Sequence, residues 1–253
     1  MPFGRKIEVK KSKYEIDMCS GSIMDKLISF SLPLMLSGIL QLMFNAVDII
    51  VVGRFSGSEA LAAVGSTTAL ISMFTNLFIG VSLGTSVLTA RFYAAGRDQE
   101  VSETVHTSIM LALLSGILMV FVGLFFSRGA LELMDTPDDV IDLSTLYMKI
   151  YFVGMPFFML YTYGAALLRA VGDTKRPLFF LIISGVLNAG LNLFLVVVFH
   201  MGVAGVGIAT VISQMVSCVL VLICLYRAES SYQLRLSKLT MKGVYLKQIF
   251  QVG

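Results

Sequence analysis

The sequence predicts an all-α polytopic membrane protein, built as a bundle of six transmembrane helices. Hydrophobic residues make up 57% of the 253 positions and charged residues only 14%, whereas about a quarter of a soluble domain is charged. Six apolar runs also reach about 20 residues, the length with which an α-helix crosses the hydrocarbon core. The runs are continuous and do not alternate, which excludes a transmembrane β-barrel.

The first three runs follow a charged tail. The tail, Met1–Lys26, has no apolar core and is therefore not a secretory signal. Leu27–Gly53, the first run, contains Pro33, which we predict to act as a hinge because proline removes a backbone hydrogen bond. Ala60–Ala90 is longer than a bilayer requires and should tilt or project from it. Thr104–Phe126 has the expected length.

Three further runs complete the predicted lobe, which covers residues 27–226. They are Ser144–Leu168, in which Pro156 should kink the helix, then Leu178–Phe199 and Val203–Tyr226. Residues 227–253 are polar at first, and we interpret them as a cytoplasmic linker followed by the start of a missing second lobe.

The positions of Lys and Arg predict that both termini are cytoplasmic in a plasma-membrane protein. Sixteen of the 19 lie in the tail, in the loops after the second and fourth runs, or after the sixth run. Basic residues concentrate on the cytoplasmic side of membrane proteins. The loop after the third run, on the opposite side, is acidic. A net charge of +3 with scattered basic residues argues against a nucleic-acid partner.

One carboxylate, Asp48, lies deep within an apolar run, and the other 15 acidic residues lie in tails, loops or helix ends. A charge inside the bilayer costs about 2.5–3.5 kcal/mol or more, so such residues are candidates for function. No Arg or Lys lies deep in any run to neutralise it. Asp48 should therefore carry a proton or hold a bound cation, which is the chemical basis of an exchanger.

Polar residues on two other runs lie at the level of Asp48. With a rise of about 1.5 Å per residue, Asp48, Asn192 and Thr210 lie about 7, 9 and 10 Å below the outer ends of the first, fifth and sixth runs. Each belongs to a stripe with helical spacing. The stripes are Gln41, Asn45 and Asp48; Asn188 and Asn192; and Thr210 and Gln214, with Ser213 and Ser217 beside them. They predict a polar cavity that opens outward between these three runs.

A structural role competes with this interpretation. Polar side chains in membrane helices often only join helices, at about 0.6 kcal/mol per hydrogen bond. This alternative is favoured for Asn45, Ser213 and Ser217, and the functional interpretation is favoured for Asp48. Two isolated histidines make no metal site, and the sequence has no Walker A, HExxH or GxSxG motif, so we expect no enzyme and no cofactor. An ion channel or an inactive membrane scaffold remains a rival hypothesis.

Several segments resemble the multidrug and toxic-compound extrusion (MATE) family of transporters. Phe44–Gly57 (FNAVDIIVVGRFSG) and Glu59–Gly65 (EALAAVG) resemble the motif of its first helix. Further similar segments follow in the same order: Gly80–Ala90 (GVSLGTSVLTA), Arg91–Gly96 (RFYAAG), Leu168–Pro177 (LRAVGDTKRP), Asn188–Asn192 (NAGLN) and Gly202–Gln214 (GVAGVGIATVISQ). Together they cover about residues 24–226.

The resemblance implies a secondary active antiporter that exports lipophilic cations in exchange for protons or sodium. The family's cation site would fall on Asp48, Asn188, Asn192 and Thr210, and Gln41, Asn45 and Gln214 would line the substrate cavity. Several relatives carry Asp where this chain has Asn192, so we favour proton coupling over sodium. A flippase for lipid-linked oligosaccharides, from the same superfamily, ranks second because its pyrophosphate substrates would require cavity arginines.

The family has two six-helix lobes, and only one is present here. Lys247–Gly253 (KQIFQVG) resembles the start of another first helix, as Lys26–Ser31 does before the first run. Three explanations are open: a truncated chain, a half-transporter that forms a dimer with itself, or a second lobe encoded separately. We favour truncation.

Overall fold

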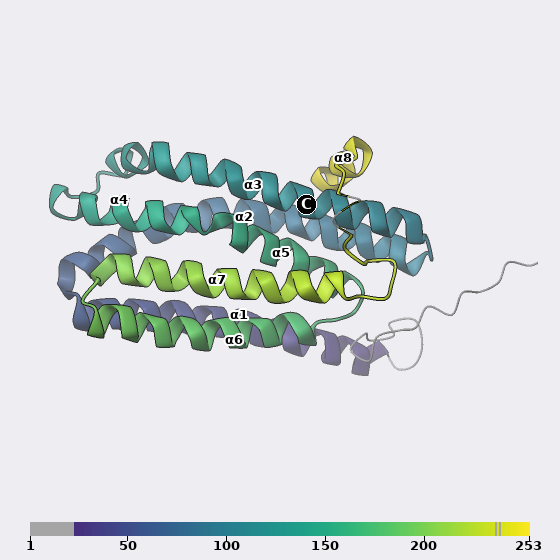
Figure 1. The fold of residues 1–253 in the computed structure, drawn as a ribbon, viewed down its shortest axis with the longest axis horizontal. Coiled ribbons are helices and arrows are strands. Elements are labelled where there is room, and N and C mark those ends of the chain that lie inside the picture. The colour runs from purple at the N-terminus through teal and green to yellow at the C-terminus, as the bar shows by residue number, and fades with distance from the viewer. Residues whose placement is uncertain (1–22, 236, 238) are drawn as a thin grey trace, which may run out of the picture.

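The computed structural model describes residues 23–235, 237 and 239–253 as a bundle of long helices that run along one axis (Figure 1). Most of the predicted amino-terminal tail lies outside the described residues. No strand occurs among the residues described. The helices are α1 (Ile23–Phe55), α2 (Gly57–Ala94), α3 (Asp98–Leu133), α4 (Asp138–Val153), α5 (Met155–Ala170), α6 (Lys175–Leu193), η1 (Phe194–Val198), α7 (Gly202–Tyr226) and α8 (Gly243–Val252).

Helix lengths and composition confirm the predicted membrane fold. In the described part of the chain, five helices are long and apolar enough to cross a bilayer, and the bent pair α4 and α5 makes a sixth span if it is counted as one. The helices extend beyond the predicted runs at most ends. The third run shows the largest difference, because α3 continues from Phe126 to Leu133.

The fourth predicted run is not one helix. It is divided at Gly154 into α4 and α5, which bend by 48° relative to one another. Pro156 lies in the first turn of α5, where its missing N–H costs no hydrogen bond, so the expected kink is confirmed as a complete break. Pro33 behaves differently, because α1 continues through it and Ser37 Oγ donates to the Pro33 carbonyl at 2.8 Å. Its role as a hinge stays a prediction.

Glycines bring the helices into close contact. A Cβ at Gly116 of α3 would lie 2.5 Å from Cα of Pro156, and one at Gly123 would lie 2.1 Å from Cβ of Phe152. A larger residue at either position would push α3 away from the break between α4 and α5. This packing keeps the break in the bundle, where its freed backbone groups are shielded from lipid.

Residues 227–235 and 239–253 pack against the same end of the bundle as the turn between α2 and α3 (Figure 1). The backbone N–H of Arg235 donates to Nε2 of His106 at 3.1 Å, and Lys242 forms an ion pair with Glu103 at 2.5 Å. The following helix, α8, lies against α2 and α3. The assignment of this segment as an interlobe linker stays a prediction.

Replacing Gly84 by Ala should displace α8. The new Cβ would lie 2.2 Å from the Ile249 carbonyl oxygen and 2.8 Å from the backbone N of Gly253, distances that no Cβ tolerates. Amide hydrogen exchange over residues 243–252 should therefore become faster. Gly65→Ala is the matched control, because it lies in the same helix and its Cβ would have no neighbour within 4 Å. Unchanged protection of α8 in Gly84→Ala would contradict this packing.

Candidate functional site

Four predicted residues form one connected chain of hydrogen bonds across three helices. Asn192 of α6 donates through Nδ2 to Oδ1 of Asp48 on α1, and the same Nδ2 lies 3.3 Å from Oδ1 of Asn188. Asn188 donates in turn to Oγ1 of Thr210 on α7 at 3.4 Å. The prediction that these residues share one level is confirmed, and their role in cation binding stays a prediction.

Close approach of α1 and α6 makes this contact possible. Gly185, two turns before Asn192, faces Phe44 so closely that a Cβ there would lie 1.9 Å from the ring. The absence of a side chain lets α6 pack onto α1 one turn before Asp48. Asp48 is 9% exposed and Asn192 is fully buried, so both belong to the interior of the bundle. The α-helix of α6 then changes to the π-helical turn η1 directly after Leu193.

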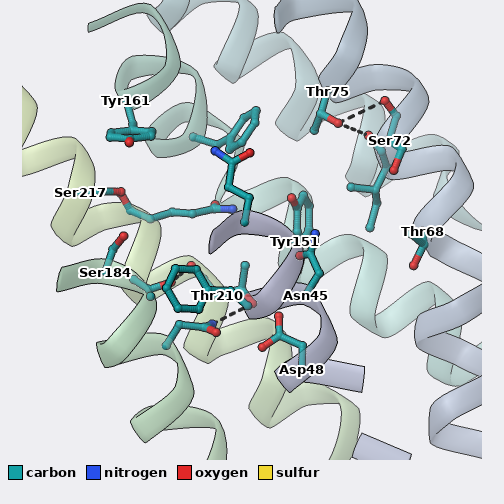
Figure 2. A pocket seen from close by; sticks show the side chains of 18 of the residues that line it. Asn45, Asp48, Thr68, Ser72, Thr75, Tyr151, Tyr161, Ser184, Thr210 and Ser217 are labelled. Atoms are coloured by element: carbon teal, nitrogen blue, oxygen red, sulfur yellow. Dashed lines mark hydrogen bonds between the residues drawn. The ribbon is translucent and has the colours of Figure 1, made fainter. Parts of the chain in front are cut away.

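A cavity of about 360 Å³ lies next to Asp48 (Figure 2). All three predicted cavity residues, Gln41, Asn45 and Gln214, line it together with Asp48, Asn188 and Thr210. Asn192 is not among the lining residues, because it lies behind Asp48. The side to which the cavity opens stays a prediction.

The first, fifth and sixth runs line the cavity as predicted, but they do not enclose it alone. Side chains of α2, α4 and α5 also line it. Sequence reasoning missed two groups: the polar stripe Thr68, Ser72, Thr75 and Asn76 on α2, and the tyrosines Tyr147, Tyr151 and Tyr161. The stripe has the helical spacing that identified the others, so the signal was present. The tyrosines gave no such signal, because aromatic residues are common in membrane helices.

The serines of α7 do not join helices, contrary to the structural alternative. Ser213 Oγ donates to the Thr210 carbonyl at 2.8 Å, and Ser217 Oγ donates to the Gln214 carbonyl at 3.0 Å. Both partners belong to α7 itself. The hydroxyls therefore add polarity to the cavity wall without fixing α7 to a neighbour.

The lining combines one acid with neutral oxygen and aromatic groups. Among the described residues that line the cavity, Asp48 is the one charged side chain. Two amide oxygens nearby, Asn192 Oδ1 and Gln214 Oε1, are buried and have no hydrogen-bond partner. A carboxylate can bind a proton, carboxylate and amide oxygens coordinate hard cations, and aromatic faces attract organic cations. The geometry therefore suits a positively charged occupant.

The chain is similar to a known protein family and to several named proteins. The family model MatE matches residues 33–194. The chain belongs to the MatE family. It is 33% identical over 208 residues to the probable multidrug resistance protein YoeA of Bacillus subtilis, covering 81% of this chain and 45% of YoeA. It is 28% identical over 240 residues to the probable multidrug resistance protein NorM of Thermotoga maritima, covering 91% of this chain and 50% of NorM.

A solved structure of this family confirms the fold. The crystal structure of MATE in the bent conformation superimposes with a TM-score of 0.85 at 24% identity, covering 92% of this chain and 52% of that one. The resemblance read from the motifs, and the six-helix lobe that it implied, are thereby confirmed. The MatE chain spans about half the length of the curated relatives it matches.

Replacing Asn192 by Leu should lower the free energy of unfolding by about 1–3 kcal/mol, because the buried Asp48 carboxylate loses its donor. Ser213→Ala should change it by less than about 0.5 kcal/mol, since that hydroxyl bonds only to its own helix. Thermal or denaturant unfolding of the purified protein in detergent measures both. Equal stability of Asn192→Leu and the wild type would contradict the proposed network.

Proposed function

We propose that this chain is the amino-terminal lobe of a secondary active antiporter, which exports lipophilic cations from the cell in exchange for protons. The observation that carries the proposal is Asp48, a buried carboxylate that lines a cavity and pairs with an amide rather than with a base. The related multidrug resistance proteins support a role in transport. A second six-helix lobe, or a second copy of this chain, would complete the transporter in the plasma membrane, with both termini in the cytoplasm.

Competition at Asp48 couples the two fluxes. A buried carboxylate in apolar surroundings is neutral only when it holds a proton or faces a cation. A cation that enters from the cytoplasmic side or the inner leaflet replaces the proton, and a proton that enters from outside releases the cation. Hydrogen bonds connect Asp48 on α1 to α6 and α7, so a change in the charge of Asp48 alters the contacts among all three helices. Pro33 is proposed as the point at which α1 bends.

The composition of the cavity supports an organic cation as the substrate. Phe44, Phe158 and the three tyrosines supply apolar and aromatic surface, and Asp48 supplies the charge. Figure 2 labels Tyr151, Tyr161 and Asp48 among these residues. No Arg or Lys is among the described lining residues. The cavity therefore offers no basic partner for the pyrophosphate of a lipid-linked oligosaccharide, and the flippase hypothesis ranks second.

The groups available to bind the coupling ion favour a proton over sodium. Sodium needs several oxygen ligands with enough negative charge, and Asp48 is the one carboxylate among the described lining residues. A proton needs only the carboxylate. An enzymatic activity is not proposed.

Asp48→Asn should abolish proton-driven efflux, reducing its rate at least about tenfold, because an amide at this position neither binds a proton nor neutralises a cation. Ethidium efflux from cells that express the protein measures this under an imposed proton gradient and, separately, under an imposed sodium gradient. Asp139→Asn is the matched control, since Asp139 is an exposed acid at the start of α4.

Two outcomes would contradict the proposal. Proton-driven efflux that persists in Asp48→Asn, with normal amounts of protein in the membrane, would remove Asp48 from the mechanism. Wild-type efflux that follows the sodium gradient and ignores the proton gradient would overturn the choice of coupling ion.

A further inference from the structure

The described lining of the cavity can neutralise one positive charge. Asp48 is the one acidic side chain among the described lining residues, and the titratable groups that also face the cavity, Tyr147 and Tyr151 of α4 and Tyr161 of α5, are neutral phenols. The lining residues of α2, α6 and α7 are uncharged. These helices enclose Asp48 together with its own helix α1, so no described lining residue adds a second negative charge.

Asn192 occupies the position from which a second charge would act. Its side chain is fully buried, donates to Asp48, and leaves its own Oδ1 without a partner. A carboxylate with the same number of heavy atoms would fit there and would face Asp48 directly. The identity of residue 192, amide or acid, therefore decides whether this site holds one or two negative charges.

A doubly charged ligand would leave one charge unpaired in the cavity. An ionic group removed from water without a partner of opposite charge is strongly disfavoured. Aromatic faces offset part of this cost, by about 0.5–2 kcal/mol, which is less than a desolvated carboxylate provides. The same counting limits each transport cycle to one proton, because Asp48 binds only one.

We infer that this site selects singly charged organic cations over doubly charged ones and exchanges each for a single proton, with Asn192 as the residue that sets this limit. The inference rests on the proposed function and adds to it the valence of the substrate. Two observations carry the inference. Asn192 contacts Asp48, and the described lining of the cavity holds no other charge.

Three phenanthridinium dyes test the inference on the purified chain in lipid nanodiscs. Ethidium is a monocation, propidium is a dication with the same ring system, and an N-hexyl analogue of ethidium is a monocation of about propidium's size. Fluorescence polarisation should give ethidium and the hexyl analogue dissociation constants at least about tenfold lower than that of propidium. Tighter binding of ethidium than of both larger dyes would mean selection by size and would overturn the inference.

Substitutions at residue 192 separate charge from hydrogen bonding. Asn192→Asp should increase the affinity for propidium at least about tenfold, with release of the proton that the two adjacent acids share. Asn192→Leu, which removes the same hydrogen bond without adding charge, should leave the preference for monocations in place. An equal gain in propidium affinity in both variants would overturn the role of charge.

The outcomes also distinguish this inference from the proposed function. Equal affinity of the wild type for ethidium, the hexyl analogue and propidium would overturn the limit on valence and leave the cation site standing. A lack of binding of all three dyes would overturn both. The comparison of dyes on the wild type needs no variant, so it holds even if Asn192→Asp does not fold.

Discussion

The structure depends on one constraint, that a carboxylate buried in apolar surroundings must be neutralised. Asp48 has no basic neighbour in the described lining of its cavity and accepts its hydrogen bond from Asn192, an uncharged amide. An amide satisfies an oxygen of the carboxylate without removing its charge, so a proton or a cation is still required. The arrangement of α1, α6 and α7, with Gly185 admitting Phe44, holds this unsatisfied charge next to an open volume.

The polar side chains around the cavity divide into two kinds. Ser and Thr hydroxyls of the cavity wall bond to their own helix: Thr68 donates to Val64 and Thr75 to Ile71, as Ser213 and Ser217 do in α7. The amides of Asn188 and Asn192 instead reach across helices, to Thr210 of α7 and to Asp48 of α1. This difference explains why the connected network consists of Asp48, two asparagines and one threonine, whereas the more numerous hydroxyls only line the cavity.

The fold and the core of the site could be predicted from the sequence, because membrane helices are long apolar runs and polar residues within them are conspicuous. The common level of Asp48, Asn192 and Thr210 followed from helical rise alone. The wall formed by α2 could have been predicted from its stripe, but hydroxyls in a helix do not indicate which neighbour they face. Pro156 indicated a kink in the fourth run, but the complete break at Gly154 and the docking of α8 onto Gly84 depend on tertiary packing, which no local pattern specifies.

The central claim is that a cation and a proton exclude one another at Asp48. The most direct measurement is isothermal titration calorimetry of a monocation such as ethidium with the purified protein, in buffers that differ in ionisation enthalpy. The account predicts that about one proton is released per cation bound at a pH where Asp48 is protonated, and that release falls toward zero as the pH is raised. Saturable cation binding without proton release at every pH would contradict it.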